Sequence, residues 1–244
     1  MRKLDVTLCI SIIVLVLLIA FSVAMRWNPF CTIESIRISG ISANSSQKLI
    51  NSLIYRNYYG LRHKEIKEQL EGLGYIDSAS MSYENGVLAL ELSNPENGVI
   101  LDSGKRASIY DGKKLISLDR ADIKELESHY IKIDIEEDYH DYLERYGSDE
   151  FNRFVAALFD LDEYSALISR AEYDNNNITG SGNLTLVFDS LNSELGVSGV
   201  QNINRLIDSV KAIEGEFSKN PIKALNGPMA RYELRSSELV RIKR

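Results

Sequence analysis

The stretch that decides the predicted fold is VTLCISIIVLVLLIAFSVAM, residues 6–25. It contains no charged residue, no proline and no glycine, and Ile, Leu and Val fill its middle. A hydrocarbon core about 30 Å thick is crossed by about 20 apolar residues, because a helix rises about 1.5 Å per residue and satisfies its own backbone hydrogen bonds. The stretch therefore predicts a transmembrane helix over residues 6–26, with residues 1–5 as a cytoplasmic stub.

The residues on either side of this stretch predict its orientation. Arg2 and Lys3 precede it, which favours a cytoplasmic N-terminus, and Trp27 suits the opposite membrane interface. A cleaved signal peptide is the alternative, since Ser22 and Ala24 could stand before a cleavage site. The apolar run is longer than the roughly 7–15 residues of a signal h-region, so an uncleaved anchor is preferred.

Composition limits the classes of protein that the chain can belong to. The 44% of hydrophobic residues is that of a folded chain, and the length suffices for one large domain or two ordinary ones. The net charge of −7 argues against nucleic-acid binding, which needs cations to displace counterions from phosphates. Cys9 and Cys31 cannot meet within one chain if the first helix is intact, so no internal disulfide is expected.

Residues 33–95 predict the order β-α-α-β-β. Alternation of Ile36 and Ile38 with Arg37 indicates a first strand, and apolar stripes at helical spacing follow over 45–57 and 64–73. Two further strands, 75–83 and 87–92, are separated by Glu-Asn-Gly, in which Asn-Gly is a strong hairpin signal because both residues accept a positive φ.

Residues 98–244 predict a β-rich region with flanking helices, which makes the whole chain α+β. Asp149 to Phe159 and residues 200–217 show helical spacing, and residues 136–145 are expected to form a charged loop that leads into a helix. Short strands are predicted over 98–101, 107–110, 115–117, 130–135, 166–173, 184–188, 232–234 and 239–242, with a polar turn over 174–183.

This order of parts resembles the FtsQ/DivIB family of bacterial cell-division proteins, whose first exported module is a POTRA domain. The likeness rests on several short motifs in the family's order, and the chain departs from it at residues 74–76, where Gly-Tyr-Ile replaces the usual Pro-Trp-Val. The motifs are IRISG (36–40), LEGLGYIDSASM (70–81), LELSNP (90–95), IYDG (109–112), Leu195-Gly196 as a loop before the late helix, and YELR (232–235).

The resemblance implies a POTRA domain over 33–95 and an FtsQ-like β domain over 98–244. It implies a non-enzymatic scaffold of the divisome in the bacterial inner membrane, single-pass, with the bulk of the chain in the periplasm at the division septum. The implied partners are an FtsB/FtsL-like coiled-coil pair and septal peptidoglycan synthases, with no cofactor and no small-molecule substrate. The alternative is a POTRA-bearing envelope adapter in protein transport or outer-membrane assembly.

The candidate binding site is the C-terminus, where residues 231–244 carry five Lys or Arg against two Glu. A terminal strand often lies at a sheet edge, where a partner strand can be added, although cations can equally serve to block unwanted pairing. The resemblance favours addition. It implies supporting positions at Tyr232, Leu234 and Arg235, a docking edge of Leu239, Val240, Arg241 and Ile242, and Arg205 as a cation for an acidic partner residue. The strand over 75–83 is a second possible edge.

Catalytic and metal-binding patterns are weak. The histidines are His63, His129 and His140, and none pairs with another at the i, i+4 spacing of a metal-binding helix. The acidic segment 134–142 could bind a cation together with His140, but a solvated charged loop is the preferred interpretation. The chain is therefore expected to bind rather than to catalyse.

Overall fold

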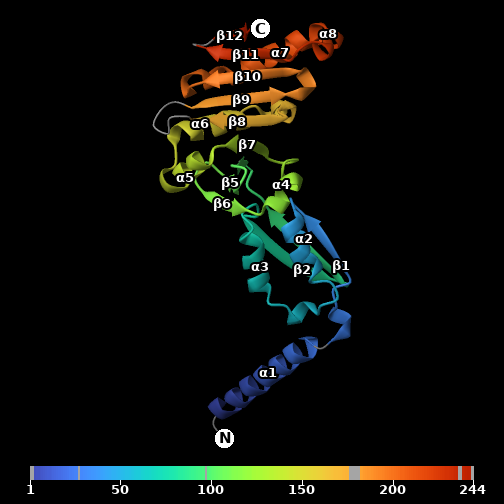
Figure 1. The fold of residues 1–244 in the computed structure, drawn as a ribbon. Coiled ribbons are helices and arrows are strands. Elements are labelled where there is room, and N and C mark those ends of the chain that lie inside the picture. The colour runs from blue at the N-terminus through green and yellow to red at the C-terminus, as the bar shows by residue number, and fades with distance from the viewer. Residues whose placement is uncertain (1–2, 27, 97, 176–181, 236–237, 243–244) are drawn as a thin grey trace. The chain divides into compact units, whose positions relative to one another are not determined.

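The computed structural model describes residues 3–26, 28–96, 98–175, 182–235 and 238–242 (Figure 1). The chain divides into two compact units, Met1–Asn94 and Pro95–Arg244. The division falls at the Asn94-Pro95 pair, which is also the boundary that the sequence indicates. Helices and strands occur in both units, and the predicted α+β class is confirmed.

The first helix, α1, runs from Lys3 to Arg26 and contains the apolar stretch. Across the described residues, no helix combines the length and the apolarity that crossing a membrane requires.

Two predictions are therefore wrong: the transmembrane helix over residues 6–26, and the location of the chain as a single-pass protein of the inner membrane with its bulk in the periplasm. The predicted interfacial role of Trp27 falls outside the described residues.

The first unit confirms the predicted β-α-α-β-β order. Its sheet has the order β1-β3-β2, with β1 parallel to β3 and β2 antiparallel to it. Asn85 and Gly86 have φ angles of 50° and 83°, as the predicted two-residue hairpin turn requires. The elements are η1 (Pro29–Cys31), β1 (Ser35–Ser39), α2 (Asn44–Asn51), η2 (Tyr58–Gly60), α3 (His63–Glu71), β2 (Ser78–Glu84) and β3 (Val87–Ser93).

The core of the first unit forms where the apolar stripes of α2 and α3 meet the sheet. Ile50 and Leu70 are buried from the helices, and Leu88 and Leu90 from β3. The strand predicted to begin at residue 75 begins only at Ser78. Tyr75 lies in the preceding connection, where its hydroxyl accepts a hydrogen bond from the Ser46 N–H (3.2 Å).

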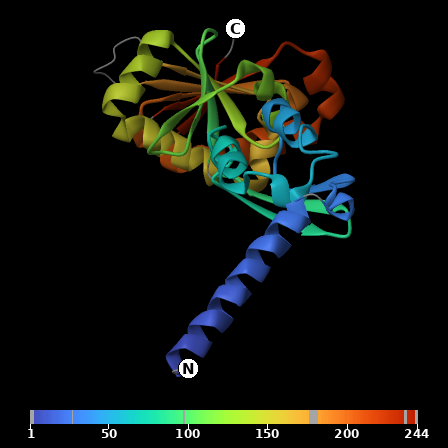
Figure 2. The same ribbon diagram turned by 90° about the horizontal axis from the view of Figure 1, so that it is seen from below.

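The second unit is built on a nine-stranded sheet of order β12-β11-β10-β9-β8-β7-β4-β5-β6 (Figure 1). Figure 2 shows the yellow-green helices α5 and α6 lying beside its strands. The strands are β4 (Val99–Asp102), β5 (Ala107–Tyr110), β6 (Leu115–Leu118), β7 (Ile131–Ile135), β8 (Arg170–Asp174), β9 (Asn183–Phe188), β10 (Ser193–Ser198), β11 (Ala230–Arg235) and β12 (Glu238–Ile242). The helices are α4 (Arg120–Leu126), α5 (Glu137–Tyr146), α6 (Asp149–Phe159), η3 (Asp162–Leu167), η4 (Asp189–Leu191), η5 (Val200–Arg205), α7 (Leu206–Lys219) and α8 (Pro221–Asn226).

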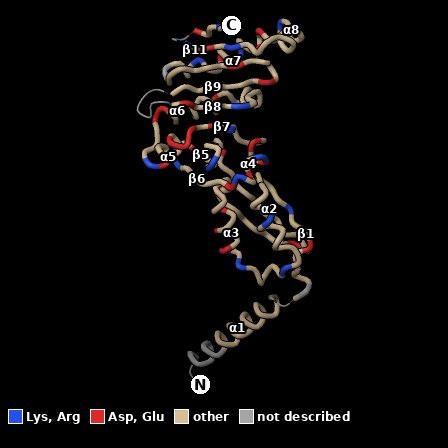
Figure 3. The backbone as a smooth tube through the Cα atoms, in the orientation of Figure 1, with Lys and Arg blue, Asp and Glu red and all other residues tan. Residues whose placement is uncertain are grey.

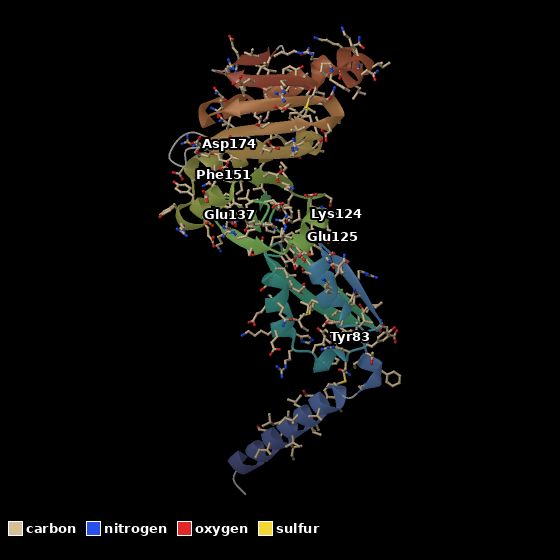
Figure 4. All side chains as sticks on the ribbon, in the orientation of Figure 1. Tyr83, Lys124, Glu125, Glu137, Phe151 and Asp174 are labelled. Atoms are coloured by element: carbon tan, nitrogen blue, oxygen red, sulfur yellow. The ribbon has the colours of Figure 1, made fainter. Side chains whose placement is uncertain are left out.

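The core of the second unit lies between this sheet and the helices α5, α6 and α7. Phe151 and Phe154 of α6 pack on Tyr173 of β8, with ring centroids 4.9 and 5.4 Å apart, and Figure 4 marks Phe151 on its helix. Each aromatic side chain buried in this way stabilises the fold by roughly 1.5–3 kcal/mol. The helix predicted over Asp149–Phe159 is therefore confirmed, and its apolar side chains face the core.

Several local predictions for the second unit are corrected. Residues 137–146 form the helix α5 rather than a loop, because Tyr139, His140 and Leu143 give it a buried face. Leu195 and Gly196 lie in the interior strand β10 rather than in a loop, because buried Leu195 and Val197 alternate with half-buried residues as a strand requires. The small and polar residues between them obscure this alternation in the sequence. Strand β8 begins at Arg170, and the polar turn over 174–183 falls largely outside the described residues.

Candidate functional site

The last strand, β12, forms one edge of the nine-stranded sheet. It pairs with β11 in an antiparallel register that runs from Arg231 opposite Ile242 to Arg235 opposite Glu238. Among the described residues β11 is its only strand neighbour, so its outer side presents backbone N–H and C=O groups that a further strand can pair with. The predicted edge position of residues 239–242 is therefore present in the structure.

The two faces of β12 differ in character. Residues directly opposite each other in an antiparallel pair share a face, so Leu239 and Arg241 lie on the same side as Leu234 and Tyr232. Leu234 and Tyr232 are buried, and Leu239 packs against the core. On the other face Val240 and Ile242 are 41% and 42% exposed.

The predicted residues thus separate into two roles. Tyr232 and Leu234 are too deeply buried to contact a partner and can act only as support for the edge. Val240 and Ile242 are available to a partner's side chains. Arg235, which is exposed at the end of β11, forms an ion pair with Glu233 on its own strand.

Glu216, near the end of α7, fastens β12 to the body of the unit. The Tyr232 hydroxyl donates a hydrogen bond to Glu216 Oε2 (2.9 Å), and the guanidinium of Arg241 pairs with Oε1 of the same carboxylate. The Arg241 guanidinium also lies over the Tyr232 ring, 5.8 Å from its centroid. Burial, helped by the Glu216 carboxylate, raises the pKa of Tyr232 to about 12, which keeps its hydroxyl a donor.

Beside this cluster lies a cavity of about 400 Å³ between α7, α8 and the β11–β12 hairpin. Phe217 and Tyr232 give it apolar walls, and Lys223 and Arg241 contribute positive charge. Figure 3 shows blue Lys and Arg positions interspersed with red Asp and Glu along this end of the second unit. Sequence reasoning missed Glu216 and this cavity, because both depend on how α7 packs on strands that follow it in the chain.

Arg205 is not brought to the docking edge. It ends the short helix η5 and precedes α7, where its carbonyl accepts a hydrogen bond from the Ser209 hydroxyl (2.8 Å). Glu216, which contacts Arg241, lies about 16 Å further along the α7 axis at about 1.5 Å per residue. Arg205 therefore belongs to the opposite end of that helix.

Two residues of the acidic segment considered as a cation site, His140 and Asp141, lie together with Glu144, which follows that segment on α5; the ligand atoms of the three lie within 4.8 Å of one another. Arg106 occupies this cluster: it pairs with Asp141 and approaches Glu144 (3.7 Å). His140 is buried and its Nε2 lies 3.0 Å from the Ser108 hydroxyl. In the structure these two carboxylates are thus partners of Arg106 in a partly exposed ion-pair network.

No protein-family model matches the chain, and no curated protein matches it in a sequence comparison.

Proposed function

We propose that the chain is a non-enzymatic scaffold of bacterial cell division that recruits its partner by strand addition to β12. The observation that carries the proposal is the geometry of this edge. Its outer side is open among the described residues, its outward face presents Val240 and Ile242, and its inner face is fixed by the Arg241–Glu216 contact. A preformed, rigid edge lowers the entropic cost of binding an extended segment.

The choice of pathway and partner rests on the resemblance of the motif order to the FtsQ/DivIB family, whose members bind an FtsB/FtsL coiled-coil pair. Under this proposal, septal peptidoglycan synthases are linked through that pair. The proposal needs no cofactor and no small-molecule substrate.

The test is the affinity of the full chain for the purified FtsB/FtsL-like pair from the same cell. The double substitution Val240→Glu and Ile242→Glu places two negative charges on the exposed face of β12. Because neither side chain belongs to the core, the substitutions should leave the packing of the second unit unchanged. Binding should weaken by at least about tenfold, or about 1.4 kcal/mol, because a carboxylate buried against the partner without a counter-charge costs at least that much. Ser117→Glu on β6, at the opposite edge of the sheet, is the matched control. Equal affinity for all three proteins would refute strand addition at β12.

The alternative, a POTRA-bearing envelope adapter, is favoured by a different observation: β2 is an edge of the three-stranded sheet in the first unit. The position of a fluorescently tagged copy in dividing cells separates the two functions. A sharp band at mid-cell before constriction supports the division scaffold. If the tagged copy shows no mid-cell enrichment, and substitutions in β2 abolish binding of the partner, the adapter function is supported.

A further inference from the structure

A groove of about 490 Å³ lies between the helices α2 and α3 of the first unit. It is lined at helical spacing from both sides, by residues 49, 53 and 56 of α2 and the turn that follows it, and by residues 62, 66 and 69 of α3 and the position before it. Its volume is in the range of roughly 300–1,000 Å³ that is usual for binding pockets. It is called the α2–α3 groove below.

Apolar side chains form part of the lining. Leu53 and Ile66 are buried and belong to the core of the unit. Leu49 and Leu61 also line the groove, but they are only half-buried, so part of each side chain is in contact with water. An apolar side chain of a ligand that covered these two leucines would remove apolar surface from water on both sides of the contact.

Arg56 gives the groove a positive charge that no carboxylate of the described residues neutralises. Each cation at the start of α3 and along it is paired with a carboxylate: Arg62 with Glu65 (2.9 Å), Lys64 with Glu68 (3.6 Å) and Lys67 with Glu71 (3.6 Å). Arg56, by contrast, lines the groove, is exposed, and forms no ion pair or side-chain hydrogen bond within the described ranges. The charge of the groove therefore favours a ligand that carries a carboxylate.

The backbone holds Arg56 in place. Its N–H donates a hydrogen bond to the Leu53 carbonyl (3.1 Å), and its carbonyl accepts one from the Ile33 N–H (2.9 Å). Tyr55, directly before it, has a φ of 65°, which is uncommon for a bulky residue, and its N–H donates to the Ile33 carbonyl (2.8 Å). Because the backbone at Arg56 is already fixed, less conformational freedom is lost when its guanidinium pairs with a ligand.

We propose that the α2–α3 groove is a binding site for a peptide segment of a partner protein, with an apolar side chain against Leu49 and Leu61 and a carboxylate at Arg56. Gln69, which is exposed at the groove, has an amide that can both donate to and accept from a peptide backbone. The site lies in the first unit and does not depend on strand addition to β12, so either proposal can fail without the other. A second copy of this chain is the competing occupant.

The experiment selects binders from a phage-displayed library of random peptides. The library is first depleted on the Arg56→Glu variant of the full chain, which removes peptides that bind elsewhere, and is then selected on the native chain. The enriched peptides should combine Asp or Glu with a large apolar residue. Their affinity, measured by fluorescence anisotropy, should fall by at least about tenfold in Arg56→Glu, because two negative charges then meet in the groove.

Arg37→Glu is the matched control, since Arg37 is an exposed arginine on β1 that does not line the groove. It should leave the affinity of the peptides unchanged. Failure to enrich acidic, apolar-containing peptides, or equal affinity of the enriched peptides for the native chain and Arg56→Glu, would overturn the site. Arg56→Glu should fold normally, because only an exposed side chain changes, and an unaltered urea denaturation curve checks this.

Two further measurements test the apolar part of the site and the competing occupant. Replacing the apolar residue of an enriched peptide by Ser should weaken its binding by at least about tenfold, and an unchanged affinity would overturn the proposed contact with the two leucines. Sedimentation of the native chain should show no self-association that Arg56→Glu abolishes. If it does, the groove belongs to an interface between copies of this chain, and the peptide proposal is wrong.

Discussion

At the scale of single residues, Gly182 occupies a position that no other side chain fits. A Cβ built on it would lie 2.0 Å from Tyr173 Oη, and Tyr173 cannot retreat because Phe151, Phe154 and Tyr139 surround its ring. The Gly182 N–H also donates to Glu150 Oε1 (3.0 Å), which fixes the backbone.

Gly182→Ala should therefore destabilise the second unit by about 1–3 kcal/mol, as overpacking of a core does. The measurement is urea denaturation of the full chain. Gly215→Ala is the control, because a Cβ at Gly215 in α7 meets nothing within 4 Å and alanine is the better helix residue by about 0.5–1 kcal/mol. Equal effects of the two substitutions would contradict the packing argument.

His140 gives the second unit a dependence on pH. Burial first, and then the neighbouring Arg106, lower its pKa below the ordinary value, while Glu144, Asp141 and Glu137 oppose the shift. The unfolded chain therefore binds the proton more readily, and stability falls as the pH drops below about 6.5.

The measurement compares denaturation midpoints at pH 7.5 and 5.5. His140→Gln should lose less stability over this interval than the native chain does. The carboxylates with lowered pKa values, Asp102 and Asp141, lose their contribution only below their ordinary pKa of about 4 and so lie outside the interval. A native chain that is equally stable at both pH values would show that His140 has no such role.

At the scale of elements, β12 depends on a contact from α7. Glu216 both accepts from Tyr232 and pairs with Arg241, so its removal should loosen the edge strand while the core strands stay protected. Because the ion pair is partly exposed, its loss is expected to cost no more than about 1 kcal/mol, or about fivefold in local opening.

Hydrogen exchange of β12 in the Glu216→Ala variant should accordingly be faster by a few-fold. Glu216→Gln retains an acceptor for Tyr232 but not the charge, and should fall between this variant and the native chain. Glu214→Ala, two residues earlier on α7, is the control. Unchanged exchange in Glu216→Ala would mean that β12 is held by its pairing with β11 alone.

Elements differ in how far the sequence predicts them, and the reasons are physical. The hairpin at Asn85-Gly86 and the helix α6 are local: turn chemistry and a four-residue apolar stripe suffice to specify them. The strand β10 is not local, since Ser193 and Gly196 fit a central strand only because β9 and β11 flank it. The edge position of β12 was predictable from its place in the chain, whereas the Glu216 contact required the packing of α7.

The transmembrane prediction was wrong for a related reason: the apolar composition of residues 6–25 was interpreted as evidence for a membrane environment. The stretch does form a helix, as α1 shows, so the local part of the prediction was correct. Within the part of the chain that the structure describes, however, no helix has the length and apolarity that crossing a membrane requires.

At the scale of the whole molecule, the division into two compact units leads us to expect two cores that unfold separately. Leu88 is fully buried in the first unit, against β1 and β2, and Leu186 is fully buried in the second, between β8 and β10. Truncating either to alanine should cost the unit that contains it about 2–5 kcal/mol. If the units fold independently, hydrogen exchange in Leu88→Ala should accelerate within residues 28–94 and stay unchanged in β7 to β10.

Leu186→Ala is the reciprocal variant, with the opposite distribution of exchange. This result would also bear on function, because partner binding at β12 should survive Leu88→Ala at a concentration of denaturant that unfolds the first unit alone. If a single substitution instead accelerates exchange in both units, the chain is one cooperative structure, and the docking edge depends on the core of the first unit as well as on its own.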